Sequence, residues 1–302
     1  MRTEPLKKLA LLPKLHSKQR NYFSIQNFLN DPQTCDYGRE PVITSPYPNL
    51  ENLMANLNPH TTHVLAPECL DDFALQPNSK FKLESILDNT LPFPANGICG
   101  IILYGLYGTG KTTMANLLPG LIDTAKSDPN AQHIQPSRIR DTTEPNSDYY
   151  ACAQGQNGAH ITQQIQNRTQ LISFNNAGFH FVIMDEVDNL TEAAQAGFKA
   201  VMNKPNVIFI MTTNNLNLVD GGIQNRSVII DMNVPPLANW RPILRRAYTN
   251  ANLPAPADAV LDQVVSASRG SARTIFTDIE MHINQAKKTG QAPVAKIANL
   301  RS

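Results

Sequence analysis

Residues 104–113 read YGLYGTGKTT, directly after the apolar run GIILY at 100–104. Residues 105–112 match the pattern G-x-x-x-x-G-K-[ST] at every position, between a predicted strand and a predicted helix that starts KTTMANLL. Glycines let the backbone fold round and aim several N–H groups at phosphate oxygens, because a Cβ would block the φ angles or the approach. The helix that starts near Lys111 adds the partial positive charge of its amino terminus. The sequence therefore predicts a phosphate-binding loop.

The side chains of this loop have distinct expected tasks. Lys111 offers a mobile positive charge to the β- and γ-phosphates of a nucleotide, and Thr112 offers a hydroxyl to Mg²⁺. The expected cofactors are therefore ATP and Mg²⁺. The alternative is a glycine-rich turn that fits the pattern by chance, which the complete match disfavours. The loop residues expected to contact the nucleotide are Gly105, Tyr107, Gly108, Thr109, Gly110, Lys111, Thr112 and Thr113.

Acidic residues follow a second apolar run, in the stretch FVIMDEVD at 181–188. A parallel strand here would bring Asp185 and Glu186 to the edge of the sheet that holds the phosphate loop. Asp185 would then hold the water shell of Mg²⁺, and Glu186 would polarise the attacking water as a general base. Taken alone, such acids are more often a helix cap and a solvated turn, but the upstream loop reverses that preference. Asp188 stays ambiguous, and Thr191 is expected to cap a helix.

Short β-branched runs alternate with helical patterns from residue 100 onward, which predicts an α/β fold with a parallel sheet and helices on both faces. The expected strands are 100–104, 148–153, 179–185, 206–213 and 227–231. Beyond Pro236, three segments with i, i+3, i+4 apolar spacing predict a small helical domain. These segments are 237–251, 256–268 and 271–288.

The remaining segments have less pattern. Residues 124–148 are polar and rich in proline, so a surface loop or insertion is expected there. The predicted domains are an N-terminal arm or small irregular subdomain at 1–70, a nucleotide-binding α/β domain at 71–235 and a helical lid domain at 236–302.

The composition indicates more about the cellular compartment of the protein than about its binding partner. The net charge of +1 is too small to indicate a nucleic-acid partner, so any contacts with nucleic acid must come from local basic patches. The four cysteines, Cys35, Cys69, Cys99 and Cys152, are spread singly, without zinc-site spacing or a disulfide framework. No apolar run reaches the roughly eighteen residues of a membrane span. The expectation is a cytoplasmic protein with no membrane partner.

These motifs resemble the AAA+ ATPases, and within them the clamp-loader branch that is similar to replication factor C. The resemblance extends from about residue 71 to residue 288. It includes DEVDNLTEAAQAGFKAVMN at 185–203, where the acidic pair leads into a helix with the Ala194-Gln195 step. The resemblance implies a P-loop AAA+ module with a five-stranded parallel sheet flanked by helices, plus a small C-terminal helical lid.

The resemblance also implies roles for residues outside the phosphate loop. Asn214, after IFIMTT, matches the position called sensor 1, and Arg273, in RGSART, matches sensor 2. Arg226, in GGIQNRSVIID, matches the arginine finger that reaches the ATP of an adjacent subunit. Phe73 and Leu75 lie in the segment that contacts adenine in the family. The alternatives are a turn residue for Asn214, a surface ion pair for Arg226 and a solvated arginine for Arg273.

The sequence departs from the branch at several places. Leu106 and Tyr107 stand where the branch usually has proline, and Asn225 and Ser227 flank Arg226 where the branch has serine and cysteine. The branch usually continues past the lid into a helical collar, whereas this sequence ends at Ser302. Assembly is therefore expected to use the ATPase modules or the N-terminal segment.

The resemblance implies an ATPase that forms a ring or spiral of identical chains with inter-subunit ATP sites. The leading hypothesis is a role in DNA replication or recombination, of bacterial or mobile-element type, with duplex DNA as partner. Lys199 and Lys204 are candidates for phosphate contacts, although lysines on a helix usually form its solvated face. The alternative is a protein-remodelling adaptor or chaperone-like switch that recruits a protein partner through residues 1–70. A monomeric phosphotransferase fits less well, because the arginine and lid motifs count against it.

Overall fold

The computed structural model describes residues 66–152 and 158–289, all of which belong to the unit Met54–Ser302. Most of the predicted N-terminal segment 1–70 lies outside the described residues, as do Cys35 and the end of the lid segment. The predicted limits of the three domains therefore stay a prediction.

A five-stranded parallel sheet forms the centre of the described unit, with the strand order β2-β3-β4-β1-β5. The predicted fold class is confirmed, and each strand begins and ends within two residues of its expected bounds. The central strands are buried on both faces, as expected for runs rich in Ile, Val and Phe. The strands are β1 (Gly100–Tyr104), β2 (Ser147–Ala151), β3 (His180–Asp185), β4 (Val207–Thr213) and β5 (Ser227–Asp231).

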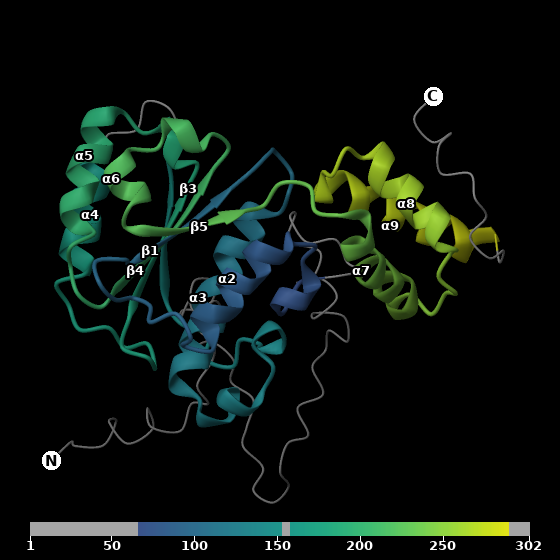
Figure 1. Cartoon of the computed structure of the whole chain (residues 1–302), viewed down its shortest axis with the longest axis horizontal. Coiled ribbons are helices and arrows are strands. Elements are labelled where there is room, and N and C mark those ends of the chain that lie inside the picture. The colour runs from purple at the N-terminus through teal and green to yellow at the C-terminus, as the bar shows by residue number, and fades with distance from the viewer. Residues whose placement is uncertain (1–65, 153–157, 290–302) are drawn as a thin grey trace, which may run out of the picture. The chain divides into compact units, whose positions relative to one another are not determined.

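Helices cover both faces of this sheet (Figure 1). On one face, the helices α2 (Pro77–Leu87) and α3 (Lys111–Ser127) pack on alternate residues of the strands, such as Ile101 and Ile183. The other face is covered by α4 (Gly158–Arg168), α5 (Glu192–Val201) and the short α6 (Gly221–Gln224). Short 3₁₀ helices connect these elements: η4 (Leu70–Asp72), η5 (Pro129–His133), η6 (Pro136–Arg138), η7 (Val187–Asn189) and η8 (Leu216–Leu218).

The parallel register separates the sheet into two functional edges. Tyr104 pairs with Thr213, and Ala151 pairs with Asp185, so the segments that follow β1, β3 and β4 all leave from the carboxyl edge. Ser227 pairs with Gly100, so the segment before β5 lies at the opposite, amino edge. Asp185 and Asn214 therefore lie at the carboxyl edge of the sheet, whereas Arg226 lies at the amino edge.

The segment 124–148 differs in part from the predicted surface loop. Helix α3 continues to Ser127, and two short 3₁₀ helices follow it. Ile139 is buried in the main core, and the backbone N–H of Thr142 donates a 3.0 Å hydrogen bond to the Thr124 hydroxyl. Most residues from 128 to 148 are exposed, as expected for a surface loop or insertion. The helical turns and the buried residues were not predicted, because isolated apolar residues among prolines and polar residues carry no periodicity, although they still pack against α3.

Three C-terminal helices form a bundle with its own core, as predicted (Figure 1). Leu244, Tyr248, Leu261 and Ile279 are fully buried among them. The helices are α7 (Leu237–Asn250), α8 (Asp258–Ala267) and α9 (Ala272–Thr289). None of the helices in the described ranges is both long and apolar enough to cross a membrane.

Candidate functional site

The phosphate-loop motif forms a tight turn between β1 and α3. Gly108 and Gly110 have φ angles of 77° and 92°, in the left-handed region that residues with a Cβ rarely adopt, and Gly110 caps the helix. The Lys111 side chain is buried, and its Nζ donates hydrogen bonds of 2.9 Å and 2.7 Å to the carbonyl oxygens of Gly105 and Leu106. The ammonium group therefore lies across the loop, where it provides hydrogen-bond donors to two backbone carbonyl oxygens.

The electrostatic environment of Lys111 connects it with the acidic residues. Burial lowers the pKa of Lys111 below its usual value, and the carboxylates of Asp185, Asp188 and Glu186 oppose this shift. The positive charge of Arg273 adds to the lowering. These charges lie close enough to interact, so the loop, the acids and the first turn of α9 share one site.

Asp185, at the end of β3, accepts hydrogen bonds from three hydroxyl groups. Thr112 Oγ1 donates to it at 3.0 Å, Thr212 Oγ1 at 2.5 Å and Tyr149 OH at 2.7 Å. Thr112 belongs to the first turn of α3, whereas Thr212 and Tyr149 come from the strands on either side of β3. The structure thus brings the predicted pair Thr112 and Asp185 into direct contact.

This cluster fits a magnesium ion by its chemistry. A hydroxyl and a carboxylate are hard oxygen ligands, which Mg²⁺ prefers. Within residues 66–152 and 158–289, no group of three or more His, Cys, Asp or Glu side chains could hold a metal ion by itself. Mg²⁺ usually takes one or two protein oxygens and completes its shell with phosphates and water, so the small donor set suits it.

Glu186 follows Asp185 in a left-handed conformation with φ 59° and ψ 53°. Its backbone N–H donates to Thr212 Oγ1 at 2.9 Å, and the Asn189 side-chain amide donates to Glu186 Oε2 at 3.1 Å. The Glu186 side chain is exposed, and Asn214 is half-buried directly after β4 at the same edge of the sheet. Both residues therefore lie at the edge where the phosphate loop begins.

Two smaller expectations concern the segment after Glu186. The backbone N–H of Ala194 donates to the Thr191 hydroxyl at 3.3 Å, so Thr191 caps α5 as expected. One carboxylate oxygen of Asp188 is buried and has no hydrogen-bond partner among the described residues. Asp188 thus adds negative charge near Lys111 while it keeps an acceptor available.

The residues expected near adenine separate in the structure. The Phe73 ring lies 3.8 Å from the position that a Cβ on Gly110 would take, so it borders the phosphate loop. Leu75 is buried in the main core instead. Tyr107 is exposed at the tip of the loop. Contacts of Phe73, Leu75 and Tyr107 with a nucleotide stay a prediction.

The first turn of α9 touches the phosphate loop. The backbone N–H of Arg273 donates a 3.1 Å hydrogen bond to the carbonyl oxygen of Gly108, and the Arg273 side chain is exposed. A Cβ on Gly108 would lie 2.6 Å from the Ser271 hydroxyl. Further contacts between α7 and the region before α2 include the ion pair of Arg246 with Asp72.

Arg226 lies apart from all of these residues. It directly precedes β5 at the amino edge, whereas the phosphate loop follows Tyr104 at the carboxyl edge. Four strand rises of about 3.3 Å place the two edges about 13 Å apart. The guanidinium Nη1 donates to the carbonyl oxygen of Gly222 at 2.9 Å, and Nε donates to Asn203 Oδ1 at 3.4 Å. Arg226 therefore does not join the site of its own chain.

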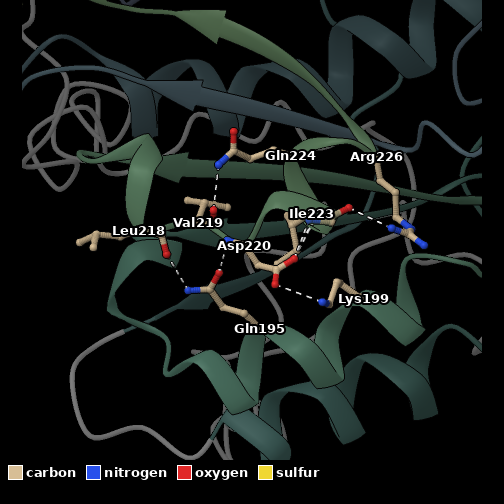
Figure 2. A network of polar contacts seen from close by, with 9 residues as sticks. Gln195, Lys199, Leu218, Val219, Asp220, Ile223, Gln224 and Arg226 are labelled. Carbon is tan, nitrogen blue, oxygen red and sulfur yellow. Dashed lines mark hydrogen bonds and ion pairs between the residues drawn. The ribbon is translucent and has the colours of Figure 1, made fainter.

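A polar network links α5 with the segment that leads to Arg226, as Figure 2 shows. The buried Gln195 donates to the carbonyl oxygen of Leu218 at 3.0 Å and accepts from the backbone N–H of Asp220 at 2.6 Å. The Asp220 side chain caps α6 and pairs with Lys199 Nζ at 3.1 Å. The segment before Arg226 is therefore held at fixed positions by α5.

Lys199 and Lys204, the candidates for contacts with DNA phosphates, are both half-buried, and such contacts stay a prediction. Lys199 forms the ion pair with Asp220, and Lys204 Nζ donates to the Gln166 carbonyl and to the Thr169 hydroxyl at 2.9 Å and 3.0 Å. Both ammonium groups thus have partners within the chain, rather than lying free on a solvated helix face.

Some residues of the site were not found from the sequence. Tyr149, Thr212 and Gln195 carry hydrogen bonds to the acidic pair or to the segment after β4. The family resemblance includes Gln195 in the Ala194-Gln195 step of a helix but implies no role for its side chain. Tyr149 and Thr212 have no local motif, since their contacts depend on strand register.

Fold and site together define a P-loop nucleotide-binding α/β protein with a C-terminal helical bundle. Residues 101–233 match the AAA family, described as the ATPase family associated with various cellular activities. The chain therefore carries an AAA family domain, and the resemblance to AAA+ ATPases is confirmed.

Known proteins similar to this chain include replication factor C small subunits. The chain is 26% identical over 206 residues to replication factor C small subunit 2 of Pyrobaculum arsenaticum, which covers 67% of this chain and 58% of the relative. It is 27% identical over 207 residues to the protein of the same name from Pyrobaculum islandicum, with the same coverage of 67% and 58%. The match thus spans less than two thirds of the length of these relatives.

Solved structures agree on the fold. The chain is similar to the RuvB Holliday junction branch migration motor of Thermotoga maritima, with a TM-score of 0.53 and 18% sequence identity. The similarity covers 78% of this chain and 70% of that one. At this identity, the similarity supports the fold of the AAA+ module and the helices after it.

Proposed function

We propose that this chain is a magnesium-dependent ATPase that assembles into a ring or spiral and acts in DNA replication or recombination. The observation that carries the proposal is the 3.0 Å contact between Thr112 Oγ1 and Asp185 Oδ1. It joins the first turn after the phosphate loop to the carboxylate of a neighbouring strand. This is the arrangement that a nucleoside triphosphate with a bound Mg²⁺ requires.

The loop binds the phosphates by its backbone N–H groups and by the amino terminus of α3. Lys111 leaves the carbonyl oxygens of Gly105 and Leu106 and turns its ammonium group to the phosphates. Bound Mg²⁺ would neutralise phosphate charge, and Thr112 and Asp185 would hold it. The side chain of Arg273 extends from a turn that is already fastened to Gly108, so it can add positive charge at the outer phosphate.

Glu186 is the residue that would take a proton from the attacking water. It is exposed at the carboxyl edge, and the Asn189 amide orients its carboxylate. Asn214 leaves the adjacent strand at the same edge, where its amide can donate to the outer phosphate or to that water. The two side chains thus approach the reacting phosphate from neighbouring strands.

The position of Arg226 supports a site shared between chains. Because Arg226 lies at the edge opposite the phosphate loop, it can complete only the site of a second copy. A contact between the amino edge of one copy and the carboxyl edge of the next is heterologous, and it closes into a ring or continues as a spiral.

The amino edge also exposes apolar side chains. Leu171, Ile172 and Phe174 precede β3, with 70%, 83% and 92% of their surfaces exposed. Apolar groups exposed together in this way are typical of protein contacts. They therefore support assembly through the edge that holds Arg226.

The names of similar proteins support DNA as the partner. The curated relatives are named replication factor C small subunits, and the similar solved structure is described as a Holliday junction branch migration motor. Free, buried thiols at Cys69, Cys99 and Cys152 support a reducing, cytoplasmic location.

Calorimetry with magnesium-ATP tests the core of the proposal. The wild-type chain should bind the nucleotide. Lys111→Ala should weaken binding, because it removes the positive charge that would lie against the phosphates. ATPase rates should then rise with duplex DNA, and the rise should shrink as salt increases. Absence of a binding signal in the folded wild-type chain would overturn the nucleotide site. Rates that ignore DNA at every salt concentration would overturn the DNA partner alone.

A further inference from the structure

Tyr149 is an unusual neighbour of the expected magnesium site. It lies in β2, at the outer edge of the sheet, and about half of its surface is exposed. Its hydroxyl donates a 2.7 Å hydrogen bond to Asp185 Oδ2. Tyr149 pairs with Ile183, two residues before Asp185, so its ring extends along the sheet toward the carboxyl edge.

The donors around Asp185 differ in how firmly they are held. Thr212 is buried near the carboxyl end of β4 and its Oγ1 donates to Oδ1, and Tyr149 donates to Oδ2 from β2. Thr112 Oγ1 spans both oxygens, at 3.0 Å and 3.2 Å, from the first turn of α3. The donors on β2 and β4 thus each hold one carboxylate oxygen of Asp185, whereas Thr112 contacts both oxygens.

The proposed function changes this set, because Thr112 is the residue that turns its hydroxyl to Mg²⁺. A carboxylate fastened by one oxygen can still rotate about its terminal torsion, for which the preferred range is broad. With donors on both oxygens, the carboxylate plane stays fixed while Thr112 leaves. A fixed carboxylate is ready to accept hydrogen bonds from the water shell of the cation.

We propose that Tyr149 is a positioning residue of the magnesium site, and that its hydroxyl holds Asp185 in the orientation that Mg²⁺ needs. The inference rests on the proposed binding of magnesium-nucleotide. It assigns to Tyr149 no direct contact with the nucleotide. Hydrogen-bond partners of metal ligands commonly change metal affinity by about 10- to 100-fold when they are removed.

Tyr149→Phe removes the hydroxyl and keeps the ring. The matched control is Tyr150→Phe, since Tyr150 packs against the opposite face of the sheet. Calorimetry with a non-hydrolysable ATP analogue measures affinity first in EDTA and then over a series of Mg²⁺ concentrations. In EDTA, the wild type and both variants should bind alike.

With Mg²⁺, Tyr149→Phe should need about tenfold more metal for the same gain in affinity, and Tyr150→Phe should match the wild type. An unchanged Mg²⁺ requirement in Tyr149→Phe would overturn the inference, and so would a lower one, which would mean that the hydroxyl competes with the cation. Equal losses in EDTA and in Mg²⁺ would indicate a general structural role and would also overturn it. A wild-type chain that binds no analogue under either condition would instead overturn the proposed function.

Discussion

The backbone N–H of Arg273 donates a 3.1 Å hydrogen bond to the carbonyl oxygen of Gly108, so the first turn of α9 is fastened to the phosphate loop. The contact uses main-chain atoms and leaves the Arg273 side chain free to extend toward the site. Gly108 has a φ of 77°, and a Cβ there would lie 2.6 Å from the Ser271 hydroxyl. Loop and helical bundle therefore meet at a position where a residue with a Cβ would be strained.

Gly108→Ala should weaken both folding and nucleotide binding. An L-residue in the left-handed region costs about 1–2 kcal/mol, and the added methyl group must also displace the Ser271 hydroxyl. Denaturant unfolding should show a loss of about that size. Nucleotide titration should show weaker binding, because the loop can relax only by moving its N–H groups.

Gly197→Ala is the control for this substitution. Gly197 lies within α5, and a Cβ at that position would meet no atom within 4 Å. Alanine is favoured over glycine in a helix interior by about 0.5–1 kcal/mol, so this variant should be more stable than the wild type. Equal effects of the two substitutions would contradict the assigned strain at Gly108.

Gln195→Leu should destabilise the chain although it keeps a side chain of similar size. The carbonyl oxygens of Leu190 and Leu218 would lose a donor, and the backbone N–H of Asp220 would lose its acceptor. A buried polar group left without a partner costs about 1–3 kcal/mol. Denaturant unfolding should therefore show a loss of at least about 1 kcal/mol, whereas the same substitution at the exposed Gln163 of α4 should change little.

The sequence predicted the elements whose signal is local. The runs at β1, β3 and β4 are apolar enough to identify central strands, and the loop before Lys111 requires a fixed order of residue types. Parallel pairing then determines that Asp185 and the loop meet at one edge. The fold, and the meeting of the loop motif with Asp185, could thus be predicted from composition, periodicity and one motif.

Contacts between distant segments could not be predicted in this way. Tyr149 reaches Asp185 only because of the register between β2 and β3, for which no local pattern exists. Lys199 looked like a free cation on a helix face, but Asp220 pairs with it from 21 residues further along the chain. Both contacts depend on packing, which a single sequence does not display.

Glu186→Gln should retain ATP and lose turnover. Glutamine has the same shape and can keep the left-handed backbone, but it cannot take a proton from water. General bases commonly contribute about 10²–10⁴-fold to a rate, so single-turnover hydrolysis should fall by at least about 100-fold at unchanged nucleotide affinity. Turnover at the wild-type rate would remove Glu186 from the proposed reaction.

Arg226→Ala should also lose hydrolysis, and its defect should be complemented by the other variant. An arginine finger contributes about 10³–10⁵-fold. In a mixture of Arg226→Ala with Glu186→Gln, some sites combine Glu186 of one chain with Arg226 of its neighbour. ATPase activity should therefore exceed the sum of the separate variants. Additive rates in the mixture, with both variants still assembling, would contradict a shared site.

Phe174→Asp should weaken assembly without weakening the fold. Phe174 is 92% exposed before β3, at the amino edge that holds Arg226, so its ring contributes little to the folded monomer. In a contact between copies, the added carboxylate would lose its hydration, which is costly. Analytical ultracentrifugation with an ATP analogue should then show smaller particles at an unchanged unfolding temperature.

Phe81→Asp is the control, because Phe81 is also exposed but lies on α2. Assembly that is unaffected by Phe174→Asp, or equally lost in both variants, would contradict a specific contact through the amino edge.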